Sequence, residues 1–197
     1  MTRELVWTGF MTLDGKVDSP GGTVEGHPGG GWVFDTEFVP EAYSLKAEEL
    51  ADTSALMFGR RSYEAFAPIW SRSSDHAAYQ ELPKYVVSSS LGESDLADDW
   101  GPTTILRSTE DVAALKQQDG GAIFIHGSAE LARRLAEANL IDRYNLLVFP
   151  YLLGSGKSVF TSDDRDRQTL RLLASDTYAN GVVKLLYAVR HRSGSRR

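Results

Sequence analysis

Two segments of this chain each combine a short apolar run, a glycine and a helix-compatible stretch, the pattern of a buried strand that turns directly into a helix. They span residues 55–64 and 122–131. Such a junction directs free backbone N–H groups and the positive end of a helix dipole at one point, which suits a phosphate group. Because the first junction also carries Arg60 and Arg61, the two together predict a ligand with several phosphates, such as a dinucleotide.

Strand and helix patterns alternate along most of the chain, which favours an α/β fold. Residues 169–177 and 182–190 read as a closing hairpin around Asn180-Gly181, since Asn-Gly is the preferred type I′ turn pair. We therefore expect three layers, with a mostly parallel twisted sheet, helices on both faces and a C-terminal antiparallel hairpin. The other strands are expected at residues 5–11, 55–58, 84–88, 103–106, 123–126 and 145–150. Helices are expected at residues 41–52, from residue 60 to near Pro68, at 109–118 with Thr109 as the N-cap, and at 129–139.

No repeat or linker divides the chain, so residues 1–190 are expected to form one domain. The glycine-rich residues 15–31 are expected to form a long mobile loop. Residues 191–197 are polar and basic, which predicts a disordered tail.

Composition narrows the class of protein. A formal net charge of −6 disfavours general binding to nucleic acids or membrane surfaces, so an anionic ligand needs a local basic pocket. The chain has no cysteine, its four histidines are scattered, and no apolar run reaches about 18 residues, the length of a membrane span. We expect a cytoplasmic protein without disulfides or a metal site, whose partner is a small molecule.

The segment Gly59-Arg60-Arg61-Ser62 is the first candidate for that pocket. Its arginines follow the carboxyl end of a strand, where a guanidinium fork would suit a 2′-phosphate and so favour NADP over NAD. The alternative is that both arginines are solvated charges, but cations are unfavourable at a helix N-terminus without a counter-anion.

The segment His126-Gly127-Ser128-Ala129 is the second candidate. Gly127 allows close approach of the backbone, Ser128 is placed to begin the helix, and a pyrophosphate could lie on the N–H groups of residues 128–130. A purely structural turn explains the same residues equally well, and a lone histidine is more often packed than catalytic.

Three further groups carry weaker signals. Ser88 and Ser89 could bind the adenosine phosphate or cap their own loop. Asp14 beside a glycine could be a turn residue or a carboxylate that orients a polar ring or fixes the loop over a nicotinamide. Residues 154–158 end in Gly-Lys-Ser, which is part of the phosphate-binding loop of nucleoside triphosphatases. That loop also requires a glycine five residues before Gly156, and this position is Tyr151, which argues against a nucleoside triphosphatase.

The ordered set of motifs resembles the dihydrofolate reductase-like superfamily, and within it the reductase domain of bacterial riboflavin biosynthesis. The resemblance extends over about residues 5–190, and the motifs in order are residues 12–16, 57–64, 87–89, 125–128, 140–144, 150–157 and Phe160.

The resemblance implies an NADPH-dependent reductase that transfers hydride to a pyrimidine, a pterin-like ring or a related small substrate, and is compatible with a homodimer. The alternative is a non-catalytic nucleotide-binding or stress-response module on the same fold. In the first case Asp14 acts at the reacting end, and Trp32, Tyr43 and Phe34 line the substrate pocket. The cofactor residues are then Met11, Gly59, Arg60, Arg61, Ser62, Ser88, Ser89, His126, Gly127, Ser128 and Ala129.

Overall fold

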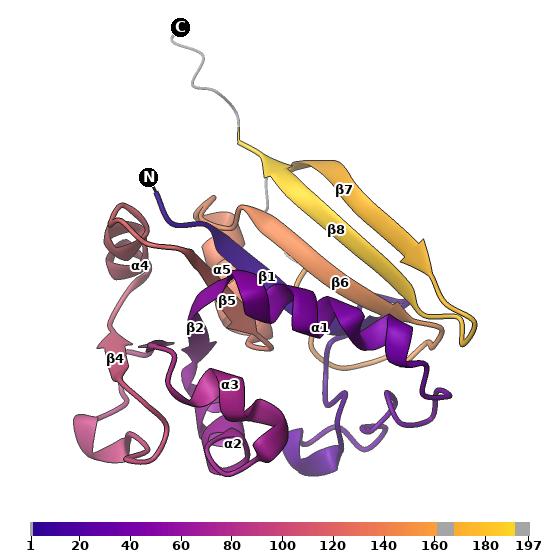
Figure 1. Ribbon diagram of the computed structural model, residues 1–197, viewed down its shortest axis with the longest axis horizontal. Coiled ribbons are helices and arrows are strands. Elements are labelled where there is room, and N and C mark those ends of the chain that lie inside the picture. The colour runs from indigo at the N-terminus through magenta and orange to yellow at the C-terminus, as the bar shows by residue number, and fades with distance from the viewer. Residues whose placement is uncertain (1, 161–167, 192–197) are drawn as a thin grey trace, which may run out of the picture.

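The computed structural model describes residues 2–160 and 168–191. Its centre is an eight-stranded sheet in the order β4-β3-β2-β5-β1-β6-β8-β7 (Figure 1). Neighbouring strands from β4 to β6 are parallel, whereas β8 is antiparallel to β6 and to β7. The strands are β1 Leu5–Thr12, β2 Thr53–Gly59, β3 Lys84–Val87, β4 Thr103–Leu106, β5 Ala122–His126, β6 Arg143–Phe149, β7 Thr169–Thr177 and β8 Val183–Arg190.

Helices cover both faces of this sheet. Successive side chains of a strand point to opposite faces, and in β2 Ala55 and Met57 belong to one buried cluster while Leu56 and Phe58 belong to another. The first cluster includes residues of α4 (Thr109–Lys116) and α5 (Ala129–Glu137). The opposite face packs against α1 (Pro40–Asp52), α2 (Arg60–Trp70) and the short α3 (Ala77–Gln80). The expected three-layer α/β architecture with a C-terminal hairpin is therefore confirmed.

Helices α4 and α5 end two residues earlier than expected, at Lys116 and Glu137, and two further differences have a clear cause in the contacts. Helix α2 continues past Pro68 to Trp70, because a proline near the last turn removes one backbone donor while the Ser71 N–H still reaches the Ala67 carbonyl at 3.1 Å. Helix α4 is capped by Ser108 rather than Thr109. The Ser108 hydroxyl accepts the Asp111 N–H at 3.2 Å, and the Asp111 carboxylate accepts the Ser108 N–H at 3.1 Å.

The glycine-rich segment 15–31 is more ordered than a simple loop. It contains a 3-10 turn, η1, over Thr23–Glu25, and the Ser19 hydroxyl accepts the His27 N–H at 3.2 Å. Two further 3-10 turns are η2, Ser74–His76, and η3, Glu93–Asp95. The expected tail lies outside the described residues except for His191. Within the described ranges, no helix is long and apolar enough to cross a membrane.

Candidate functional site

A cleft of about 2480 Å³ lies where several strands end. The segments that directly follow β2, β3, β4 and β5 all line it, together with the middle of β1 and parts of α1 and α2. The carboxyl edge of a parallel sheet is the usual place for a ligand in this fold class. The cleft is therefore the candidate site.

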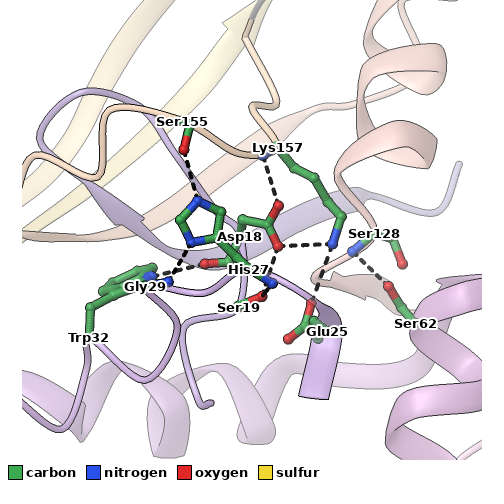
Figure 2. A network of polar contacts seen from close by, with 10 residues as sticks. All are labelled: Asp18, Ser19, Glu25, His27, Gly29, Trp32, Ser62, Ser128, Ser155 and Lys157. Atoms are coloured by element: carbon green, nitrogen blue, oxygen red, sulfur yellow. Dashed lines mark hydrogen bonds and ion pairs between the residues drawn. The ribbon is translucent and has the colours of Figure 1, made fainter. Parts of the chain in front are cut away.

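The two strand–helix junctions interlock at this cleft. The Gly59 N–H donates to Oγ of Ser128 at 2.9 Å, and the Ser128 N–H donates to Oγ of Ser62 at 3.0 Å, a contact drawn in Figure 2. Gly127 and Ser128 both have positive φ, 57° and 55°. A left-handed conformation costs an L-residue about 1–2 kcal/mol, so the tertiary hydrogen bonds must hold Ser128 there.

This interlock changes which backbone groups are free. The Ser128 N–H is used by Ser62, so the expectation that residues 128–130 all offer N–H groups is wrong for residue 128. The N–H groups of Ala129 and of residues 130–131 lie in the first turn of α5, where helical geometry supplies no partner. Ser62 accepts through its oxygen and keeps its hydroxyl proton for an anion.

The paired arginines differ from one another. Arg60 donates from Nε to Glu64 at 2.6 Å and from Nη1 to the Ser90 hydroxyl at 2.9 Å, and the Glu64 carboxylate raises the pKa of Arg60. Arg61 is exposed, lines the cleft and has no carboxylate partner among the described residues. A surface pair such as Arg60–Glu64 is weak and can yield to a phosphate.

The two serines that follow β3, Ser88 and Ser89, differ in burial and in their contacts. Ser88 is buried and its hydroxyl accepts the N–H groups of Ser90 and Leu91 at 3.2 and 3.0 Å, so it caps its own loop. Ser89 is exposed and lines the cleft. Arg107, which the sequence reasoning missed, donates from Nη1 to the Ser88 and Leu91 carbonyls at 3.1 and 2.7 Å and also lines the cleft. A cation directly after a strand was the signal that could have identified it.

A polar network that the sequence reasoning also missed lies at the β1 side of the cleft. Thr8 donates to Glu49 at 2.6 Å, Asn145 donates to the same carboxylate oxygen at 2.8 Å, and Lys46 Nζ donates to the other oxygen at 3.0 Å and to the Thr8 hydroxyl. Glu49 is 3% exposed, and Thr8 and Lys46 line the cleft. Four polar residues from β1, α1 and β6 thus hold the Lys46 ammonium group, paired with Glu49, at the cleft.

His126 lies next to this network. It is the register partner of Thr8 across β5 and β1, it is 8% exposed, and it lines the cleft. Its Nε2 has no hydrogen-bond partner. Burial, followed by the charge of Lys46, holds the pKa of His126 well below its usual value, so the ring is neutral.

Three expected site residues do not line the cleft. Trp32 is 2% exposed and donates from Nε1 to the Asp18 carbonyl at 2.9 Å, and Met11 packs against the core cluster of Trp7 and its neighbours. Gly59 lies behind the cleft wall, bonded to Ser128. Tyr43 and Phe34 do line the cleft, as expected for a substrate wall.

Asp14 likewise lies outside the cleft. It accepts the Thr12 hydroxyl at 2.6 Å and the N–H groups of Leu153 and Gly154 at 3.1 and 2.8 Å. The Thr12 hydrogen bond, helped by those two N–H groups, lowers the pKa of Asp14 to about 2. These contacts make Asp14 a clamp between two loops that is charged at neutral pH and lies outside the cleft lining.

A second loop contact borders the cleft. Figure 2 shows the Lys157 side chain directed at Asp18 and Glu25. Its ammonium group lies 3.0 Å from Asp18 and 4.0 Å from Glu25, and His27 Nε2 lies 3.0 Å from the Ser155 hydroxyl. Lys157 is thus held by carboxylates, and no helix starts in the described residues 158–160. Both facts agree with the argument against a nucleoside-triphosphate loop. No group of three or more potential metal ligands occurs within the described ranges.

Comparisons with known proteins agree with this geometry. The family described as RibD C-terminal domain matches residues 3–184. An uncharacterized protein of Bacillus subtilis, YyaP, is 27% identical over 193 residues, which cover 94% of each chain. A putative riboflavin biosynthesis protein from Shewanella has a TM-score of 0.75 at 16% identity over 97% of this chain and 100% of its own.

Dihydrofolate reductase from Enterococcus faecalis, solved in complex with NADP(H) and RAB-propyl, has a TM-score of 0.60 at 14% identity, over 97% of this chain and 100% of its own. These structural likenesses confirm the dihydrofolate reductase-like fold. Family and fold together suggest a reductase.

Proposed function

Because the chain belongs to the RibD C-terminal domain family, we propose that it is an NADPH-dependent reductase of a small pyrimidine-like or pterin-like heterocycle. The observation that carries this proposal is the interlock of the two junctions through Gly59, Ser62 and Ser128. It brings two helix N-termini to one wall of the cleft, and each offers first-turn N–H groups to an anion.

The residues at this end of the cleft fit a nicotinamide dinucleotide carrying a 2′-phosphate. The N–H groups of 129–130 and the Ser62 hydroxyl would hold the pyrophosphate. Arg60, Arg61 and Ser89 would hold the 2′-phosphate, and Arg107 would support the loop beneath it. Ser88 would act through that loop, since its own hydroxyl is occupied.

The polar network would act at the reacting end. When bound, NADPH supplies the hydride, and the protein provides orientation and a proton. Lys46 uses two of its N–H groups on Thr8 and Glu49, which leaves one to donate to a carbonyl oxygen or ring nitrogen of the substrate. His126 would offer the neutral Nε2 as a second hydrogen-bonding group.

Titration with NADPH and with NADH tests the cofactor assignment. Trp7 and Trp70 line the cleft, so their fluorescence is expected to be quenched by a bound nicotinamide. We expect NADPH to bind at least about tenfold more tightly than NADH, as a charge-assisted contact to the 2′-phosphate implies. Equal affinities would remove the 2′-phosphate assignment.

Turnover tests the activity itself. NADPH consumption at 340 nm is expected with at least one ring from a panel of pyrimidines and pterins that includes 5-amino-6-(5-phosphoribosylamino)uracil. Tight NADPH binding with no consumption for any such ring would favour the non-catalytic nucleotide-binding module instead. Cytoplasmic location and a homodimer remain parts of this proposal, and the molar mass in solution tests the latter.

A further inference from the structure

The cleft has opposite electrostatic character at its two ends. Around the interlocked junctions it is lined by five arginines, of which Arg61 and Arg107 have no carboxylate partner among the described side chains. The other three are paired with glutamates by i,i+4 contacts: Arg60–Glu64, Arg133–Glu137 and Arg134–Glu130. This end can accept additional negative charge.

The opposite end, between η1, the start of α1 and the loop at 156–158, is acidic. Its two cleft-lining cations are both neutralised, Lys46 by the buried Glu49 at 3.0 Å and Lys157 by the buried Asp18 at 3.0 Å. Three further carboxylates line this end, namely Glu25, Asp35 and Glu37. Lys157 reaches only Glu25 among these, at 4.0 Å.

The surfaces of the acidic end suit a flat ring. Phe38 and Tyr43 are stacked with their ring centroids 5.2 Å apart, Phe10 meets Tyr43 edge to face at 6.1 Å, and all three line the cleft. Phe34 and Phe38 are 77% and 70% exposed, which is unusual for phenylalanine unless a partner covers it.

Polar groups are available beyond these aromatic walls. The unpartnered Nε2 of the buried His126 and the remaining N–H of Lys46 can bind heteroatoms at one edge of a ring. A polar atom buried without a partner is costly, and the Nε2 of His126 and the Oγ1 of Thr36 are two such atoms on residues that line the cleft.

From this arrangement we propose that the substrate is a planar, carbonyl- or imine-bearing heterocycle without a phosphate, neutral or cationic overall. The inference rests on the proposed function and names the substrate class of that site. A phosphate in the acidic end would face three carboxylates and find no uncompensated cation there among the described residues, whereas the dinucleotide phosphates lie at the arginine end. Like charges placed together in a cleft are strongly unfavourable.

The test compares 5-amino-6-(5-phosphoribosylamino)uracil with its dephosphorylated form, 5-amino-6-ribosylaminouracil, on protein saturated with NADPH. Saturation is first verified by tryptophan quenching, so failure of the proposed function is seen separately as absence of NADPH binding. Calorimetry, with NADP⁺ replacing NADPH so that no hydride transfer takes place, then measures the affinity of each uracil. We expect the dephosphorylated compound to bind at least about tenfold more tightly, and this preference to shrink when salt rises from about 0.02 to 0.3 M.

Two matched triple variants test whether the carboxylates of the acidic end cause the preference for the dephosphorylated uracil. The triple variant Glu25→Gln, Asp35→Asn, Glu37→Gln is expected to reduce the preference at least about threefold. The control triple Glu93→Gln, Glu110→Gln, Glu137→Gln changes exposed acids away from the acidic end and should leave the preference unchanged. Tighter binding of the phosphorylated compound, no binding of the dephosphorylated one, or an equal response of both triples would overturn the inference.

Discussion

The Gly59 amide donates a hydrogen bond to the Ser128 hydroxyl at 2.9 Å, across 69 residues of sequence. This bond joins the end of β2 to the start of α5, and the reverse contact from the Ser128 amide to Ser62 closes the pair. The cleft wall therefore depends on a serine held in a left-handed conformation.

Ser128 gives a direct test of that relationship. Ser128→Ala loses the side-chain hydrogen bond and keeps the left-handed strain, whereas Ser128→Gly loses the bond but relieves the strain. We expect the glycine variant to be more stable than the alanine variant by about 1 kcal/mol in urea unfolding, and both to bind NADPH more weakly. An alanine variant as stable as the glycine variant would show that the left-handed conformation is not maintained in solution.

The exposed pair Arg60–Glu64 competes with the proposed 2′-phosphate. Arg60→Ala is expected to weaken the binding of NADPH by about ten- to hundredfold and the binding of NADH much less, because only NADPH loses a charge-assisted contact. Glu64→Gln is expected to strengthen NADPH binding about two- to fivefold, since it removes the competing carboxylate. Tryptophan fluorescence titration measures both. An equal loss for the two cofactors in Arg60→Ala would contradict the assignment.

The Lys46–Glu49 pair is a test of the polar network. Lys46→Met leaves the 3%-exposed Glu49 without its counter-charge, and we expect a loss of about 2 kcal/mol in unfolding free energy. This is less than the 3–5 kcal/mol of a fully buried pair, because the Lys46 side chain is 25% exposed. Adding Glu49→Gln should recover most of the stability but not the turnover. Full turnover in the double variant would exclude Lys46 from proton delivery.

The lowered pKa of Asp14 predicts a specific pH dependence of the free energy of unfolding. Its pKa is lowered to about 2 in the folded protein from 3.8 in an unfolded chain, so its contribution is complete above pH 4 and is lost as the pH falls through the range 4 to 2. Asp14→Asn should therefore be less stable than the natural protein at pH 6, and the difference should narrow towards pH 2. A difference independent of pH would show that the charge of Asp14 is not what joins the two loops.

Lys157 provides the last test. Lys157→Ala removes the counter-ion of Asp18, whose side chain is 10% exposed, and should release the loop that contains η1. Hydrogen exchange is expected to accelerate at residues 18–31 and to stay unchanged in β5. No binding of Mg-ATP is expected before or after the substitution.

Much of the architecture was readable from local patterns. The apolar run 55–58 has no polar position, and the structure buries all four residues in β2. The Asn180-Gly181 pair lies between β7 and β8 as expected. The helix-side residues of the two junctions, Arg60–Ser62 and His126–Leu131, line one cleft because parallel strands end at the same edge.

The sequence by itself determined the set of helices and strands, their order in the fold class and the basic end of the cleft. It could do so because periodicity, turn residues and strand–helix junctions each depend on a few neighbouring residues. Only the tertiary structure decided that Thr8, Lys46, Glu49 and Asn145 meet, that Asp14 and Trp32 serve loops and core instead of the cleft, and which arginine is paired. The physical reason is that these contacts join residues up to 140 positions apart, and strand order, which no local pattern encodes, selects them.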